Sequence, residues 1–269
     1  MNAKHAFIFD CTSNDYVYRT VDSYGTVLYP ASITKLFTCY VAMQYLSVEE
    51  EILLGYEQYL YPSDTSRAYF YPGETISVQT LLYGVLLPSG CDAVYALVAT
   101  AGRRILNNPD AGAQAAIDAF VAEMNRQAKT LGMGATNFIT PDGSHNKEHV
   151  ISFHAFVIIA RCAMSNPHIK AVFGKHYVTV SYKGSDGKTI YKDLVNTNYL
   201  LDPNSSYYCS EAIGMKTGST NAAGKCFMGL FSYNGEYVII GVFGCSADRN
   251  RWQDALALWA YYKQIKPLL

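Results

Sequence analysis

The chain has 269 residues, of which half are apolar and 16% are charged, and its formal net charge at pH 7 is −1. This length and apolar content allow a sizeable buried core in one large domain or two small ones. The near-neutral charge gives no electrostatic support for binding a nucleic acid or an anionic membrane surface.

Seven cysteines and six histidines are spread along the chain. No Cys-x-x-Cys pair occurs, and the closest histidine pair, His145 and His149, lies in a polar stretch without a glutamate pattern. We therefore expect no metal and no other cofactor. The odd number of cysteines rules out a complete disulfide framework, so we interpret them mostly as small buried apolar residues.

The first part of the chain contains two short segments of strand character, residues 6–10 and 16–20, which predict a β-hairpin. Pro30 ends this region. An apolar run with helical period begins at Ser32 and predicts a helix to about residue 46. Residues 49–73 then form a polar connection rich in tyrosine.

The middle of the chain is predicted to be mostly helical. Apolar residues recur at three- and four-residue steps between Ser77, the predicted N-cap, and Pro88. Ser89 follows in a tight turn between two helices. The remaining predicted elements of this part are helices at 91–101, 111–131 and 152–164, the last capped by Ser152, and a turn at 140–144.

From residue 177 the apolar period changes to two, which is typical of strands. Asn234-Gly235 is a type I′ turn signal between the last two strands. A final helix begins at Asp248 or Asn250 and extends to about residue 265. The predicted strands are residues 178–182, 189–191, 213–219, 224–231 and 237–243.

Strands at both chain ends with helices between them predict an α+β fold. We expect one antiparallel sheet made by both ends of the chain, with an inserted helical cluster. The sheet part covers about residues 4–30 and 177–269, and the helical part covers about 31–176. No linker rich in proline, glycine or serine marks a second domain, so we expect a single domain over residues 1–269.

Ser32 and Lys35 form a Ser-x-x-Lys motif at the start of a predicted helix. Residues three apart on a helix share a face, so the hydroxyl and the amine can meet. The lysine could remove the serine proton if burial and nearby positive charge lowered its pKa. Alone the motif is weak evidence, because an N-cap serine followed by a surface lysine is common.

Two later motifs strengthen this interpretation: Ser89-x-Cys91 after a helix, and Lys216-Thr217-Gly218 in a strand-like region. The three motifs, in this order, resemble the Ser-x-x-Lys, Ser-x-Asn and Lys-Thr-Gly signatures of the serine penicillin-binding proteins and β-lactamases.

The flanking sequence resembles the low-molecular-weight D-alanyl-D-alanine carboxypeptidases in particular. The resemblance extends from about residue 6 to the end of the chain. The stretches that carry it are residues 30–35, 81–90, 136–138, 196–198 and 214–218.

This resemblance implies the DD-peptidase/β-lactamase-like fold and three catalytic residues. Ser32 would form an acyl-enzyme with the carbonyl of the penultimate D-alanine and release the terminal D-alanine. Lys35 would be the general base, although which residue deprotonates the serine is disputed within this superfamily. Ser89 would relay a proton between Lys35 and the leaving amine.

The resemblance also implies a substrate-binding set. Lys216 and Thr217 would hold the C-terminal carboxylate of the substrate. Gly218 would leave room for the substrate backbone to approach. The N–H of Ser219, a position where many relatives have histidine, would form the oxyanion hole with that of Ser32.

Some positions depart from the family pattern or leave two interpretations open. Cys91, which the resemblance implies as a substrate-binding residue, stands where the family usually has asparagine, and a thiol is a weak donor and acceptor. Asn198 matches an asparagine near the cleft of relatives, or it is a loop asparagine. Arg249 and Arg251 could help to bind the carboxylate, but a solvated helix start is the preferred interpretation.

The expected partners are peptidoglycan stem peptides that end in D-Ala-D-Ala, and β-lactam antibiotics. The sequence shows no secretory leader, transmembrane segment or β-rich C-terminal domain of the kind that many relatives carry. Because the family's substrate lies outside the cytoplasmic membrane, we expect an extracytoplasmic protein whose leader is absent from this sequence.

Alternatives to the carboxypeptidase remain open at this level. They are a DD-transpeptidase, a class A-like β-lactamase and a non-catalytic β-lactam sensor domain. Against the β-lactamase, no Glu-x-x-x-Asn element lies between Ser89 and Lys216. Against the sensor, the sequence shows no transmembrane signalling segment.

Overall fold

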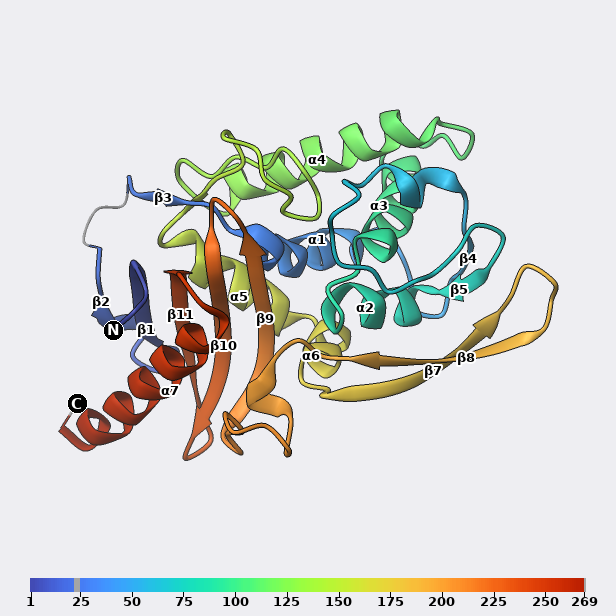
Figure 1. Ribbon diagram of the computed structural model, residues 1–269. Coiled ribbons are helices and arrows are strands. Elements are labelled where there is room, and N and C mark those ends of the chain that lie inside the picture. The colour runs from blue at the N-terminus through green and yellow to red at the C-terminus, as the bar shows by residue number, and fades with distance from the viewer. Residues whose placement is uncertain (22–24, 269) are drawn as a thin grey trace.

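The main sheet joins the two ends of the chain (Figure 1). The computed structural model describes residues 1–21 and 25–268. All neighbouring strands of this sheet are antiparallel, and the first strand pairs with the last. In spatial order the strands are β2 (Asp15–Arg19), β1 (His5–Asp10), β11 (Glu236–Cys245), β10 (Gly224–Tyr233) and β9 (Ala212–Thr220). The predicted α+β fold is therefore confirmed.

Both faces of this sheet are buried. Successive side chains of a strand point to opposite sides, and those of β1 pack into two different apolar clusters. Ala6 and Ile8 pack in the cluster that contains Trp252 and Trp259 of α7 (Asp248–Ile265). Phe7 and Phe9, which alternate with them, pack in the larger cluster shared with the helical part. Figure 1 shows α7 across one face of the sheet and the helices on the other.

The helical part contains the predicted cap at Ser77, whose hydroxyl accepts from the N–H of Thr80 at 3.2 Å, and also a helix at residues 167–173 that the sequence pattern did not predict. Its helices are η1 (Ala31–Ile33), α1 (Thr34–Ala42), η2 (Tyr56–Tyr59), α2 (Val78–Leu86), α3 (Cys91–Ile105), α4 (Ala113–Thr130), α5 (Ala155–Ser165) and α6 (Pro167–Phe173).

Several helix boundaries differ from prediction, and α3 continues to Ile105, past the predicted end at residue 101. Ser32 lies in the 3₁₀ turn η1, where Ala31 has a φ of +47°, so α1 begins only at Thr34. The helix α1 ends at Ala42, and the residues that follow form turns. Ser152 does not cap a helix. It belongs to β6 (Ile151–Ser152), which pairs with β3 (Val27–Leu28), and α5 begins after His154.

The hairpin of β7 (Tyr177–Lys183) and β8 (Thr189–Val195) was predicted to join the main sheet. It does not. It pairs with β4 (Glu51–Leu53) and β5 (Thr75–Ser77) in a four-stranded sheet of order β4-β5-β7-β8. Figure 1 shows this hairpin extending away from β9. The predicted boundary at residue 177 therefore assigned the hairpin to the wrong sheet. Its partner edge is β5, a short strand just after the tyrosine-rich connection.

The seven cysteines are all free thiols, and five of them are buried. Within residues 1–21 and 25–268, no three His, Cys, Asp or Glu side chains are grouped as ligands for a metal ion. Over the same ranges, none of the helices combines the length and the apolar character that crossing a membrane requires.

Candidate active site

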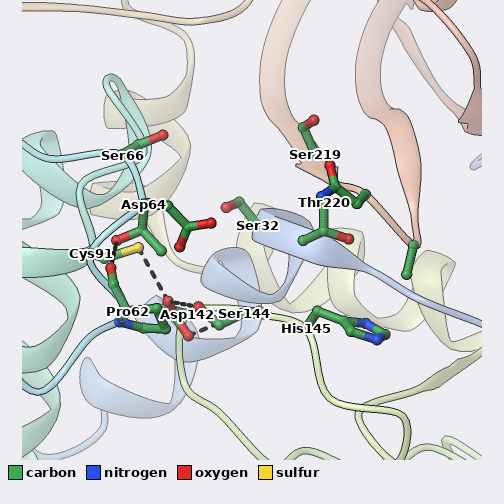
Figure 2. Close-up of a pocket in the computed structure, with 14 residues that line it drawn as sticks. Ser32, Pro62, Asp64, Ser66, Cys91, Asp142, Ser144, His145, Ser219 and Thr220 are labelled. Atoms are coloured by element: carbon green, nitrogen blue, oxygen red, sulfur yellow. Dashed lines mark hydrogen bonds between the residues drawn. The ribbon is translucent and has the colours of Figure 1, made fainter.

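A cleft of about 660 Å³ opens beside Ser32. Figure 2 shows Ser32 between two walls, one carrying Cys91 and Asp64 and the other carrying Ser219 and Thr220. The remaining lining residues are Pro62, Thr65, Ser66, Asp142, Gly143, Ser144, His145, Asn221 and Ala222.

The backbone immediately before Ser32 is strained and tightly packed. Ala31 has a φ of +47°, which is unfavourable for a residue with a Cβ. Its carbonyl accepts from the Thr34 hydroxyl at 2.9 Å. A Cβ built on Gly143, itself at φ +84°, would lie 1.9 Å from that carbonyl oxygen. Only glycine at 143 therefore allows the 140–144 turn to pack against the turn that carries Ser32.

His149 connects the same two segments. Its Nδ1 accepts from the N–H groups of Ile139 at 3.0 Å and Thr140 at 3.1 Å, so Nε2 carries the proton and donates to the Thr34 hydroxyl at 3.1 Å. Burial lowers the pKa of His149 to about 4, so the ring is neutral at pH 7. His149 is therefore a buried residue that connects the two segments.

Lys35 is fully buried, with its amine directed at Ser32. Nζ lies 2.8 Å from Oγ of Ser32, 2.9 Å from the main-chain oxygen of Asp142 and 3.4 Å from Sγ of Cys91. The predicted meeting of hydroxyl and amine is therefore present. This contact places the amine where a general base must lie to remove the hydroxyl proton.

Asp142 is the site residue that the sequence analysis missed, having placed it only in a turn. Its carboxylate is buried and accepts from the Cys91 thiol at 3.2 Å and from both the N–H and the hydroxyl of Ser144. Burial alone raises the pKa of Asp142, but the charge of Lys35 and the Ser144 hydrogen bonds outweigh it, so the pKa is lowered. The sequence signal that could have predicted its role is the expected burial of Lys35, because a buried ammonium requires a nearby negative charge.

Cys91 bridges Lys35 and Asp142. Burial raises the pKa of its thiol to about 11, despite the opposing charge of Lys35. The protonated thiol donates to Asp142 and accepts from Lys35, although both interactions are weak for sulfur.

The wall beside Cys91 is attached to the start of α3. The N–H of Cys91 donates to the carbonyl of Ser66 at 2.8 Å. The buried carboxylate of Asp92 accepts from the N–H groups of Ala68 at 2.8 Å and Phe70 at 3.0 Å. These bonds fix the segment that forms one side of the cleft.

Ser89 is buried in the turn between α2 and α3, with a left-handed φ of +65°. Its hydroxyl has no hydrogen-bond partner among the described residues. Buried hydroxyls normally have a partner, so this one is available to a bound molecule.

Strand β9 forms the opposite wall. Lys216 is fully buried, and burial, followed by the charges of Lys35 and Arg251, lowers its pKa well below the ordinary value. The Thr217 hydroxyl lies 2.7 Å from that of Thr197.

The close approach of β9 to η1 depends on Gly218. A Cβ on Gly218 would lie 3.2 Å from the backbone nitrogen of Ser32 and 2.9 Å from the carbonyl oxygen of Pro30. The absence of a side chain at Gly218 thus brings the strand end with Ser219 alongside the N–H of Ser32.

The preferred interpretation of Arg251 as part of a solvated helix start is wrong. Arg251 is buried, its guanidinium donates to the carbonyls of Gly218 and Cys226 at 3.3 Å each, and it forms an ion pair with Asp248. The fold of α7 onto β9 and β10 buries it. Arg249 is exposed.

Asn198 does not line the cleft. Its side-chain oxygen accepts from the N–H of Leu200 at 3.1 Å and caps η3 (Tyr199–Leu201). Its amide nitrogen is buried and has no partner in the described part of the chain. Asn198 follows Thr197, whose hydroxyl contacts that of Thr217, so it lies one residue from a side chain that contacts β9.

The sheet-and-helix fold, with Ser32 and Lys35 in contact, Cys91 of the Ser-x-Cys motif beside Lys35 and the Gly218 end of β9 against Ser32, is that of the serine penicillin-binding protein and β-lactamase class. Within that class, the chain belongs to the D-alanyl-D-alanine carboxypeptidase family Peptidase_S11, whose family model matches residues 1–247.

Individual relatives agree with this assignment. The chain is 32% identical over 253 residues to the D-alanyl-D-alanine carboxypeptidase of Streptomyces sp. (strain K15), covering 88% of this chain and 82% of the relative. It is 28% identical over 243 residues to the D-alanyl-D-alanine carboxypeptidase DacB2 of Mycobacterium tuberculosis, covering 88% and 75%. The crystal structure of the Streptomyces K15 DD-transpeptidase matches with a TM-score of 0.86 and 27% identity over 97% of each chain.

Proposed function

We propose that this protein is a serine DD-peptidase that removes the terminal D-alanine from peptidoglycan stem peptides through an acyl-enzyme on Ser32. The observation that carries the proposal is the 2.8 Å contact between Ser32 Oγ and Lys35 Nζ beside an open cleft. Membership of the D-alanyl-D-alanine carboxypeptidase family supports the substrate class.

In the proposed acylation, Lys35 is the general base. It takes the proton of the Ser32 hydroxyl while Oγ forms a bond to the carbonyl carbon of the penultimate D-alanine. The unpartnered hydroxyl of Ser89 relays this proton from Lys35 to the leaving nitrogen, the peptide C–N bond breaks, and D-alanine leaves. Water then hydrolyses the ester and regenerates Ser32.

Substrate binding is proposed to use the strand side of the cleft. Lys216 and Thr217 hold the terminal carboxylate. The N–H groups of Ser32 and Ser219 stabilise the oxyanion, and the gap left by Gly218 keeps them close.

A second candidate is the DD-transpeptidase, in which an amine rather than water accepts the acyl group. Two observations favour it: the similarity to the Streptomyces K15 DD-transpeptidase, and Cys91 in place of the usual asparagine. A thiol orients a hydrolytic water less well than an amide does, because its hydrogen bonds are weak.

β-Lactams are proposed to acylate the same Ser32. Because the proposed substrate lies outside the cytoplasmic membrane, we propose that the protein acts there.

The deciding experiment measures D-alanine release from a D-Ala-D-Ala peptide, with and without an amine acceptor, by wild type and Ser32→Ala. Both proteins are also labelled with a fluorescent penicillin. Release and labelling by wild type, both lost in Ser32→Ala, are the expected result. Labelling without release under any condition would indicate a sensor, and label that is rapidly lost would indicate a β-lactamase.

A further inference from the structure

A second groove, of about 310 Å³, continues the cleft on the side of the β9–β10 turn. Ala222 lines both cavities. The ring of Tyr29, in the groove, contacts the ring of His145, in the cleft, with centroids 5.0 Å apart. Two lysines line the groove: Lys4, just before β1, and Lys147, in the loop before β6.

The charges of the groove and the cleft differ. Lys4 and Lys147 line the groove, and no ion pair between described residues involves either of them. No carboxylate is among its described lining residues, whereas Asp64 and Asp142 line the cleft. Burial and the charge of Lys4 lower the pKa of His5, so that ring is neutral and the two lysines carry the charge.

Lys4 is held in place although it is exposed. Its N–H donates to the carbonyl of Phe243 at 2.9 Å, which extends the pairing of β1 with β11. Gly244, at φ +75°, lies under its side chain: a Cβ there would be 3.0 Å from Cβ and 3.1 Å from Cγ of Lys4. The glycine thus allows the aliphatic part of Lys4 to lie on the strand, with its ammonium at the groove.

The direction of a bound peptide follows from the roles proposed along β9, so this step rests on the proposed function. The terminal carboxylate lies at Lys216 and Thr217, and the carbonyl under attack lies at Ser219. The peptide upstream of the scissile bond therefore continues toward Ala222, where the groove begins. An extended chain advances about 3.3–3.6 Å per residue, so only residues several positions upstream reach beyond the cleft.

We propose that this groove is a subsite for the upstream part of the stem peptide, and that Lys4 and Lys147 bind a free carboxylate on it. The group that fits is a free carboxylate on a residue several positions upstream of the scissile bond. The two unpaired ammonium groups and the continuity at Ala222 carry this assignment.

The test uses two fluorescent pentapeptides that end in D-Ala-D-Ala and differ only in this carboxylate, which is free in one and amidated in the other. Binding is measured by anisotropy on Ser32→Ala, which blocks turnover, and KM is measured on the wild-type background. We expect the free carboxylate to bind about three- to tenfold more tightly at low salt. The preference should decline in high salt and approach one in a Lys4→Met/Lys147→Met variant.

Lys188→Met is the matched control, because Lys188 is an exposed lysine in the β7–β8 turn, which Figure 1 shows far from β9. It should keep the wild-type preference. Equal binding of the two peptides, no binding of either, or a preference that survives the double substitution would overturn the subsite. A wild type that releases no D-alanine would instead contradict the proposed function, while the ratio of dissociation constants still decides the subsite.

Discussion

The ammonium group of Lys35 donates to the main-chain oxygen of Asp142 at 2.9 Å, across 107 residues of sequence. The carboxylate of Asp142 accepts from the Cys91 thiol, whose sulfur also accepts from Lys35. Lysine, thiol and carboxylate therefore form one buried unit beside Ser32, and this unit contains a residue outside the three family motifs.

Removing the Asp142 charge should destabilise the protein. Asp142→Asn leaves the buried charge of Lys35 without its counter-charge, and we expect a loss of about 3–5 kcal/mol in the free energy of unfolding. Denaturant unfolding measures it, with Asp64→Asn at the exposed cleft rim as the control. In a double-mutant cycle with Lys35→Met, the combined loss should be smaller than the sum of the single losses, and strict additivity would contradict the coupling.

The bridge at Cys91 should matter for acylation. Cys91→Ala removes both interactions with Lys35 and Asp142, and we expect penicillin acylation of Ser32 to slow by about tenfold or more. Cys91→Asn supplies an amide that can donate to Asp142 and accept from Lys35, so it should retain more activity than Cys91→Ala. Stopped-flow labelling measures both rates, and equal rates would show that the bridge is not used.

Gly143→Ala should disrupt the turn that carries Ser32. Its Cβ would lie 1.9 Å from the Ala31 carbonyl oxygen, in addition to the strain of a left-handed φ. The matched control is Gly187→Ala, which has φ +77° but no atom within 4 Å of the added Cβ. The control should lose only about 1–2 kcal/mol of stability. Gly143→Ala should lose clearly more and label with penicillin at least about tenfold more slowly.

His149 should make stability depend on pH in the acid range. Its pKa is lowered from 6.5 to about 4 in the folded protein, mainly by burial. Below pH 6.5 the unfolded chain binds a proton that the folded protein does not, so stability falls between about pH 6.5 and pH 4. The full effect of His149 is about 3 kcal/mol, and above pH 6.5 it contributes none.

The check compares unfolding free energies at pH 7 and pH 4 for wild type and His149→Asn, in which the amide oxygen replaces the Nδ1 acceptor. The variant should lose less stability between the two pH values. An unchanged pH dependence would show that other groups cause the acid effect.

Local sequence determined several features correctly. The spacing of Ser32 and Lys35 brings them together even though Ser32 lies within a 3₁₀ turn and not at the start of the predicted α-helix. Asn234 and Gly235 both have positive φ in the turn between β10 and β11, as their residue types predict. These features depend on contacts within a few residues, and short-range geometry limits the alternatives.

Only the tertiary structure decided which distant segments meet. Asp142 belongs to a turn whose local sequence does not predict a buried carboxylate, and its role depends on packing against η1 and α3. The local sequence around Arg251 predicts an exposed helix residue. Arg251 is buried because α7 packs on β9 and β10.

The sequence by itself determined the class of protein, the sheet built from both chain ends, and the three motifs around Ser32. The structure decided the partner sheet of the β7–β8 hairpin, the counter-charge of Lys35 and the groove beside Ala222. The physical reason is range. Periodicity and capping act between neighbours in the chain, whereas burial of a charge depends on segments that lie far apart in sequence and meet only in the folded molecule.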